Sequence, residues 1–235
     1  MRSQASNLLI KAIAFAAEKH KNQRRKDAES SPYINHPIAL ADILANEGGI
    51  DNLNVLCAAI LHDTIEDTET TEQELLEHFG AEIAAIVLEV TDDKNLPKEV
   101  RKQLQIDYAS SNSHEAKLVK LADKISNLRD IHASPPSDWD IERKRKYFEW
   151  AAAVVAGLSG TNLILEKIFD DLAAQKIKLS FEEAKQDWLE NHVKGRSWVQ
   201  MMDDRDAELD KKFAALHADP EYKKLWGKTD DEDSE

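Results

Sequence analysis

Residues 55–67 read VLCAAILHDTIED. The first seven positions are apolar without interruption, which predicts a buried helix over residues 52–62. A dense polar group follows directly, made up of His62, Asp63, Glu66 and Asp67. Burying unpaired charge at the end of an apolar element is costly, so this charge must be paired or bound to a cation. The stretch therefore predicts a helical core that ends at a metal site.

The rest of the chain also favours helices. Its 235 residues include only seven glycines and six prolines, which is few for a fold of many short strands and turns. Apolar periodicity predicts an all-α protein, with a loop at 22–35 and a polar break at 91–97. The other predicted helices cover 5–21, His36 to about Gly48, 71–79, 81–90, 98–109, 115–131, 138–158 and 161–175.

Composition excludes several classes of function. The formal net charge of −14 argues against nucleic acid as a partner, because that binding depends on neutralising phosphates. No apolar stretch reaches the roughly 18 residues of a membrane span, so we predict no membrane partner. The single cysteine, Cys57, cannot form an internal disulfide, which agrees with a cytoplasmic location.

The spacing within the polar group favours a metal. If the helix continued through Asp67, His62 would stack above Glu66, one turn away. His36 lies at the start of another predicted helix and could supply a second imidazole. Two imidazoles with two carboxylates suit a divalent manganese, iron or zinc ion. The competing interpretation is a helix cap beside a surface acidic patch, and spacing alone does not decide between them.

Two further features have a simple structural interpretation when they are considered alone. Asp123 lies beside Val119 and Asn127 on a helical wheel, at the margin of the apolar face, which favours a solvated position. The basic cluster in and after the first helix fits either a solvated turn or a site for a small polyanion. Its members are Lys19, Lys21, Arg24, Arg25 and Lys26.

Five stretches, in order along residues 5–175, resemble the HD-type hydrolase family. They are RRKD with PYINHP, AAILHDTIEDT, EVTDDKNLPK, AKLVKLADKISNLRD, and YFEWA. The chain is more closely similar to the small stand-alone relatives of the RelA/SpoT hydrolase domain, the metazoan SpoT homologues among them. This resemblance implies a helical HD domain and a manganese ion, ahead of zinc or iron.

The resemblance also implies roles for individual residues. The predicted metal ligands are His36, His62, Asp63 and Asp123, so the resemblance replaces the solvated interpretation of Asp123. Glu66 and Asp67 match the acidic pair associated with the hydrolytic water. The predicted substrate-binding residues are Arg25, Lys26, Asn127 and Tyr147.

The activity implied by the resemblance is removal of the 3′-pyrophosphate from guanosine tetra- or pentaphosphate, which ends stringent-response signalling. Three alternatives stay open. The same site could act on NADPH or another nucleotide, the protein could be a non-enzymatic alarmone sensor, or it could be a helical scaffold. The sensor is disfavoured because every ligand position and both acids are present.

We predict three parts of the chain. Residues 1–179 form the HD-type hydrolase domain, residues 180–228 a helical extension, and residues 229–235 an acidic disordered tail. The extension is rich in aromatic residues, such as Trp188 and Trp198, and is a candidate surface for homo-oligomerisation.

Overall fold

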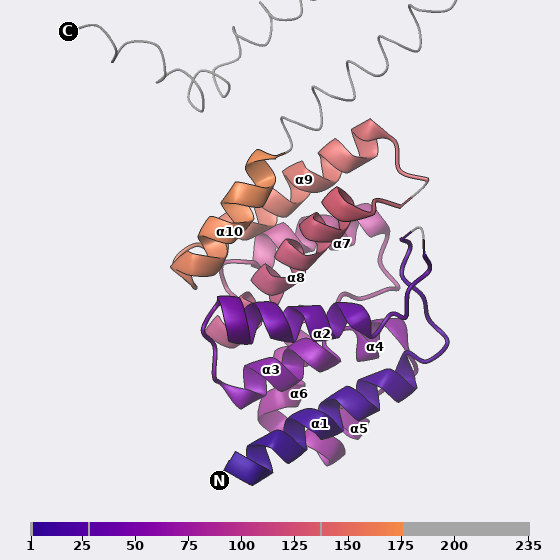
Figure 1. The fold of residues 1–235 in the computed structure, drawn as a ribbon, viewed down its shortest axis with the longest axis vertical. Helices are drawn as coiled ribbons and strands as arrows, with labels where there is room; N and C mark the ends of the chain where they lie inside the picture. The colour runs from indigo at the N-terminus through magenta and orange to yellow at the C-terminus, as the bar shows by residue number, and fades with distance from the viewer. Residues whose placement is uncertain (1, 28, 137, 176–235) are drawn as a thin grey trace, which may run out of the picture. The chain divides into compact units, whose positions relative to one another are not determined.

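The computed structural model describes residues 2–27, 29–136 and 138–175 (Figure 1). These residues form an all-helical arrangement, as predicted. Within the described ranges, β-type pairing is limited to one isolated antiparallel bridge, between Arg24 and Pro32 in the predicted 22–35 loop. The predictions made for 180–228 and 229–235 lie outside the described residues.

The helices agree with the predicted ones to within a few residues at each end. The bounds are α1 (Arg2–Lys19), α2 (Asn35–Asp42), α3 (Leu53–Leu61), α4 (Thr64–Asp67), α5 (Glu72–Phe79), α6 (Ala81–Val90), α7 (Lys98–Tyr108), α8 (His114–Ala133), α9 (Ile141–Ala156) and α10 (Leu163–Ala174). A π-helical turn, η1 (Ile43–Glu47), follows α2 directly, so the helix that was expected to end near Gly48 changes its winding in its second half.

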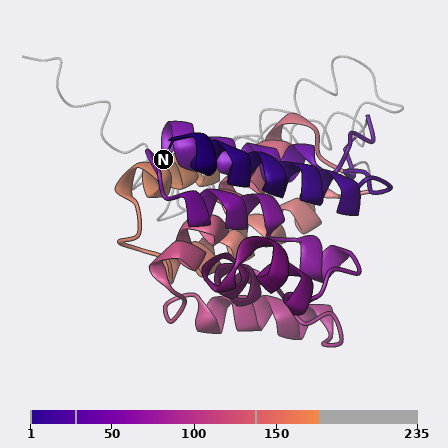
Figure 2. The same ribbon diagram turned by 90° about the horizontal axis from the view of Figure 1, so that it is seen from below.

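Helix α3 lies at the centre of the domain, where it contacts α1, α2, α6 and α8. Figure 2 shows α1 crossing in front of the other helices when the domain is viewed from below. Residues 57–61 are almost wholly inaccessible to solvent, and Ala58 and Ala59 allow neighbouring helices to approach closely. Because neighbours surround α3, any polar group at its end lies in the interior.

Helix α3 agrees with the predicted range of 52–62 and does not continue through Asp67. Helix α3 ends at Leu61, His62 caps it, and Asp63 has φ −97° and ψ −1°, outside the usual helical values. The single turn of α4 then begins at Thr64, whose hydroxyl donates to the Leu61 carbonyl at 2.6 Å. The break therefore replaces the one-turn stacking of His62 above Glu66.

Helix α5 begins at an N-cap residue, Thr71. Thr71 Oγ1 accepts a hydrogen bond from the Glu74 backbone N–H at 3.2 Å. The carboxylate of Glu74 forms an ion pair with Lys19 Nζ at 2.7 Å, so this side chain ties α5 to the end of α1.

Helix α8 is buried around most of its circumference. Its buried positions include two lysines, Lys120 and Lys124, at 9% and 3% exposure. Lys120 Nζ donates to the Val90 carbonyl at 2.9 Å, and Lys124 Nζ lies 4.3 Å from the centre of the Trp150 ring. These two charged residues of α8 therefore lie in the protein interior, and Asp123, whose side chain is 17% exposed, forms an ion pair with Lys124 there.

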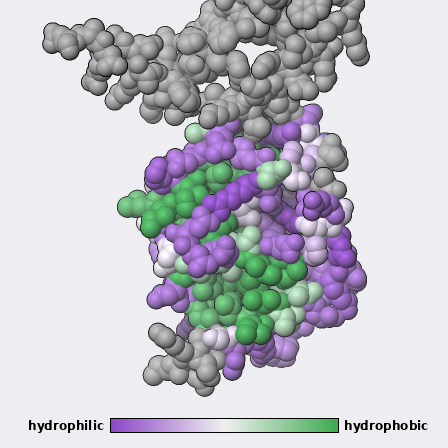
Figure 3. Space-filling model, viewed as in Figure 1, coloured by the Kyte–Doolittle hydropathy of each residue, from purple (hydrophilic) through white to green (hydrophobic). Residues whose placement is uncertain are grey.

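The surface is mixed in polarity. The face seen in Figure 3 has apolar areas bordered by hydrophilic ones. Large exposed apolar side chains include Ile10, Tyr108, Leu163 and Ile164. Among the described helices, none combines the length and the apolar character needed to cross a bilayer.

Candidate metal centre and active site

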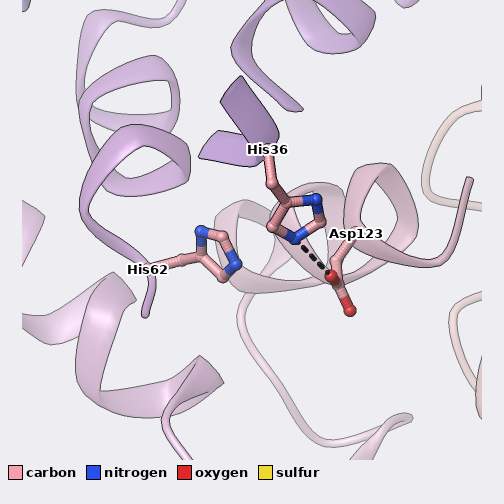
Figure 4. Close-up of side chains that lie close together, drawn as sticks. All are labelled: His36, His62 and Asp123. Carbon is pink, nitrogen blue, oxygen red and sulfur yellow. Dashed lines mark ion pairs between the residues drawn. The ribbon is translucent and has the colours of Figure 1, made fainter. Parts of the chain in front are cut away.

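Three of the four predicted metal ligands converge in the interior (Figure 4). His36 lies in the first turn of α2, His62 caps the end of α3, and Asp123 lies in the middle of α8. One ligand atom from each residue lies within 4.8 Å of those of the other two. His36 Nε2 is 3.3 Å from Asp123 Oδ1. The packing of α2, α3 and α8 against one another thus brings these metal-binding atoms close together.

Hydrogen bonds on the far side of each imidazole set its orientation. His62 Nδ1 lies 2.8 Å from the Ala59 carbonyl oxygen, which can only accept, so Nδ1 carries a proton. In its neutral form, His62 then presents the Nε2 lone pair to a metal, the arrangement typical of histidine ligands. His36 Nδ1 contacts Ser126 Oγ at 3.2 Å, which leaves its Nε2 toward Asp123.

Asp63, the fourth predicted ligand, lies beside this group of three rather than within it. Asp63 Oδ2 lies 2.9 Å from His62 Nε2 and accepts a hydrogen bond from the Tyr33 hydroxyl. In the described part of the chain, His62 Nε2 is buried and has no partner with hydrogen-bond geometry. A buried nitrogen without a partner, close to a carboxylate, fits a shared cation.

The electrostatics of the site also fit a cation. Burial would raise the pKa of Asp123, but Lys124 and the two histidines hold it well below its usual range. Burial alone would lower the pKa of His62, but the charges of Asp63 and Asp123 outweigh it and raise the pKa to about 9. Burial lowers the pKa of His36, which keeps that imidazole neutral and able to bind a metal. Two ionised carboxylates therefore attract positive charge to the two imidazoles.

The predicted acidic pair follows on α4. Glu66 Oε2 accepts a hydrogen bond from the Asp92 backbone N–H at 3.2 Å, and its Oε1 lies 3.4 Å from Arg101 Nη1. Burial, with the charges of Asp63 and Asp92, raises the pKa of Glu66 to about 7. A carboxyl group with this pKa can exchange a proton near neutral pH. Asp67 is more exposed and forms an ion pair with Lys94.

The predicted substrate contacts differ in their surroundings. Arg25 forms an ion pair with Asp130, and its Nη2 lies 3.3 Å from Asn127 Oδ1. Asn127 also donates to Asp123 Oδ1 at 2.6 Å, so it contacts a predicted metal ligand directly. Lys26 is exposed at the surface.

Tyr147 lines a cavity of about 210 Å³. Its ring packs against Trp139 and Trp150, with centroids 5.5 and 5.3 Å away. Burial and the charge of Asp123 raise the pKa of Tyr147, which keeps the phenol neutral. The aromatic walls suit a planar ring, and the cavity is also lined by Asp92, Lys98, Arg101, Lys102, Gln105 and Arg143.

Sequence reasoning missed most of this lining. Lys98, Lys102, Arg143 and Trp150 also line an adjoining hollow of about 610 Å³ between α7 and α9. The two helices were predicted from apolar periodicity, which indicates the face that packs against the core and not which cations line a cavity. Tyr33, in contrast, lies inside the PYINHP stretch and could have been singled out there.

Comparison with known proteins places the chain in a class. Residues 12–147 match the model of the HD domain, and the chain belongs to this family. The match spans the helices that supply His36, His62 and Asp123, so the converging group lies inside the family domain.

The relatives are more specific. Over 172 residues the chain is 56% identical to guanosine-3′,5′-bis(diphosphate) 3′-pyrophosphohydrolase MESH1 of Xenopus tropicalis, covering 73% of this chain and 96% of that protein. The human protein of the same name is 55% identical over 176 residues, covering 75% and 98%. A solved structure described as a metazoan orthologue of SpoT that hydrolyses ppGpp has a TM-score of 0.70 at 45% identity, covering 72% of this chain and 95% of that one.

Proposed function

We propose that this protein is a guanosine-3′,5′-bis(diphosphate) 3′-pyrophosphohydrolase. It would convert ppGpp to GDP and pyrophosphate, and pppGpp to GTP and pyrophosphate. The observation that carries the proposal is the convergence of His36, His62 and Asp123 in a chain 56% identical to an enzyme of that name.

We propose manganese as the metal, with zinc and iron as the alternatives. His36, His62, Asp63 and Asp123 would hold it. This donor set of imidazoles and carboxylates suits a divalent ion of intermediate hardness. When bound, such an ion lowers the pKa of a water molecule and stabilises charge on phosphoryl oxygens.

The acidic pair would manage the hydrolytic water. Glu66 takes a proton from the water that attacks phosphorus, because its raised pKa of about 7 makes it an effective base near neutral pH. Asp67 orients the same water from the next position of α4. The bond between ribose O3′ and the adjacent phosphorus breaks, O3′ gains a proton, and pyrophosphate leaves with the water oxygen.

The remaining predicted residues would hold the nucleotide. Arg25 and Lys26 offset the charge of the phosphates, which the acidic chain would otherwise repel. Tyr147 contributes to an aromatic wall for the guanine base, and Asn127 joins the nucleotide side of the site to Asp123. The cations that line the 210 Å³ cavity, such as Lys102, support an anionic substrate.

A substrate comparison tests the proposal. Metal-stripped protein is incubated with guanosine tetraphosphate and, separately, with NADPH, each with and without manganese, and pyrophosphate is resolved from orthophosphate. We expect manganese-dependent pyrophosphate from the guanine nucleotide. If only NADPH is hydrolysed, with release of orthophosphate, the proposed substrate is wrong and the proposed site stands. Binding of guanosine tetraphosphate without turnover would favour a sensor.

We also propose a cytoplasmic location and a homo-oligomer that assembles through residues 180–228. Both proposals rest on the sequence: the single cysteine and the aromatic residues of the extension. Size-exclusion chromatography with light scattering, on the full chain and on a chain ending at residue 179, tests the second.

A further inference from the structure

Arg101 contacts the candidate base, Glu66, and also lines the 210 Å³ cavity that Tyr147 lines. It lies on α7, 35 positions from Glu66, and its Nη1 is 3.4 Å from Glu66 Oε1. The other oxygen of Glu66 accepts from the backbone N–H of Asp92. Both side chains of the Arg101–Glu66 pair are largely buried, at 23% and 19% exposure. Glu66 is therefore held between a guanidinium and a main-chain N–H.

This contact differs from an ordinary arginine–glutamate pair in the same domain. Arg129 binds Glu47 through two short hydrogen bonds of 2.6 and 2.7 Å, and they lower the pKa of Glu47. Arg101 makes one long contact, and the pKa of Glu66 is raised. Within the described residues, Arg101 Nε is buried without a hydrogen-bond partner. A purely structural pair would use more of the five guanidinium donors.

The charges around Glu66 give this single contact its importance. The groups that act on Glu66 from the elements packed around it are Asp63, Asp67, Asp92, Lys120 and Arg101. The three acids repel the carboxylate. Lys120 Nζ donates to a backbone carbonyl, so Arg101 is the cation that contacts Glu66 directly. Removing the guanidinium would leave the carboxylate repelled by the acids and attached only to a main-chain N–H.

The location of Arg101 connects this contact to the substrate. Arg101 lines the 210 Å³ cavity together with Lys98, Lys102 and Arg143. An anionic group entering this cavity meets cations on α7 and α9, and Arg101 is the one that contacts Glu66. The orientation of the base is thus fixed by a residue in the wall of the cavity.

We propose that Arg101 is a positioning residue that orients the Glu66 carboxylate, so that its contribution to hydrolysis passes through Glu66. This inference rests on the proposed function, because Glu66 is the base of that reaction. The alternative roles for Arg101 are a structural ion pair and a direct substrate contact.

A double-mutant cycle distinguishes these roles. The variants are Arg101→Met, Glu66→Gln and the double variant, assayed with guanosine tetraphosphate and manganese. We expect Arg101→Met alone to lower kcat by about 10- to 100-fold, as is typical of residues that orient a catalytic group. We expect KM to change by less than about threefold, because the lost interaction acts on the transition state. In the Glu66→Gln background, the same change should cost less than about twofold.

Controls separate positioning from folding. Arg129→Met breaks the arginine–glutamate pair with Glu47 and should leave kcat within about twofold of wild type. Arg101→Lys keeps one charged donor and should recover part of the lost rate, which a loss of folding would not allow. Thermal unfolding and bound manganese are measured for every variant. If Arg101→Met does not fold, the cycle is run with Arg101→Lys.

The outcomes are distinct. Equal fold-losses from Arg101→Met in the wild-type and Glu66→Gln backgrounds would overturn the inference, because the two residues would then act independently. A rise in KM with kcat unchanged would overturn it in favour of a substrate contact. Wild-type protein that does not turn over guanosine tetraphosphate would overturn the proposed function, and this inference with it, before any variant is made.

Discussion

Tyr33 donates its hydroxyl hydrogen to Asp63, a residue 30 positions away. Burial and the charge of Asp63 raise the pKa of Tyr33, so the phenol stays a proton donor throughout the physiological range. The ring also stacks on His20 at a centroid distance of 4.7 Å, and His20 Nδ1 contacts Gln23 Oε1 at 2.6 Å. Tyr33 thus orients a predicted metal ligand from the segment between α1 and α2.

Tyr33→Phe should weaken manganese binding by about 10-fold, because partners that orient a ligand contribute on this scale to metal affinity. The ring and its stacking on His20 are retained, so the change reports on the hydroxyl alone. Isothermal titration of the metal-stripped protein measures the dissociation constant. Tyr108→Phe, at a position 58% exposed on α7, is the matched control. An unchanged dissociation constant would show that Tyr33 does not act through Asp63.

Asp63→Ala should abolish both metal retention and turnover. Asp63 Oδ2 lies 2.9 Å from His62 Nε2, so removing Asp63 takes away the charge that draws a cation to that atom. Manganese content after gel filtration, measured by elemental analysis, tests the prediction. Asp107→Ala removes a carboxylate on α7 that accepts a hydrogen bond from Gln103 and is not a predicted ligand, so this variant should keep the metal. Metal bound to Asp63→Ala at the wild-type ratio would exclude Asp63 as a ligand.

Glu66→Gln should keep the metal and lose most of the rate. The amide retains the shape of the side chain but cannot accept a proton, and general-base catalysis contributes about 10²- to 10⁴-fold. Manganese content and kcat are measured on the same preparation. Glu77→Gln, on the exposed side of α5, is the control. Turnover close to wild type in Glu66→Gln would assign the base to another group.

Most of the fold could be predicted from the sequence because apolar periodicity is local. Helices α3, α6 and α8 each show a long apolar pattern, and the structure begins and ends them close to the predicted positions. The end of α3 was predicted to within one residue, but the separate turn of α4 after Asp63 could not be predicted in this way. It depends on the backbone dihedral angles of one residue, which leave no mark on the apolar pattern.

The site shows a second limit of periodicity. Asp123 was interpreted as solvated on its helical wheel, since polar residues usually mark the exposed face. Helix α8 is enclosed by neighbours, and even Lys124 beside Asp123 is 3% exposed. The family resemblance, in contrast, grouped Asp123 with His36 and His62, and the three residues lie close together. Neither apolar periodicity nor the family resemblance pointed to Arg101, because its contact with Glu66 spans 35 positions and exists only in the folded chain.

The raised pKa of Glu66 has a consequence for stability. Burial and neighbouring acids raise it from an ordinary value of 4.5 to about 7. Between pH 4.5 and 7 the folded protein therefore holds a proton on Glu66 that the unfolded chain has already released. Since the folded state then binds more protons, the free energy of unfolding falls as pH rises through this window. The full decrease in the free energy of unfolding, at most about 3 kcal/mol, is reached above about pH 7.

Glu66→Gln should remove this dependence, because the amide does not titrate. In metal-free protein, the variant should gain stability over wild type as pH rises, with a difference that is larger at pH 8 than at pH 5 by up to about 3 kcal/mol. Urea unfolding of both proteins at the two pH values, in the presence of a chelator, measures this difference. His62 and Asp63 titrate in both proteins, so their contribution largely cancels in the comparison. A difference that is the same at pH 5 and pH 8 would mean that Glu66 is ionised throughout, and that another group sets any pH dependence of the rate near neutrality.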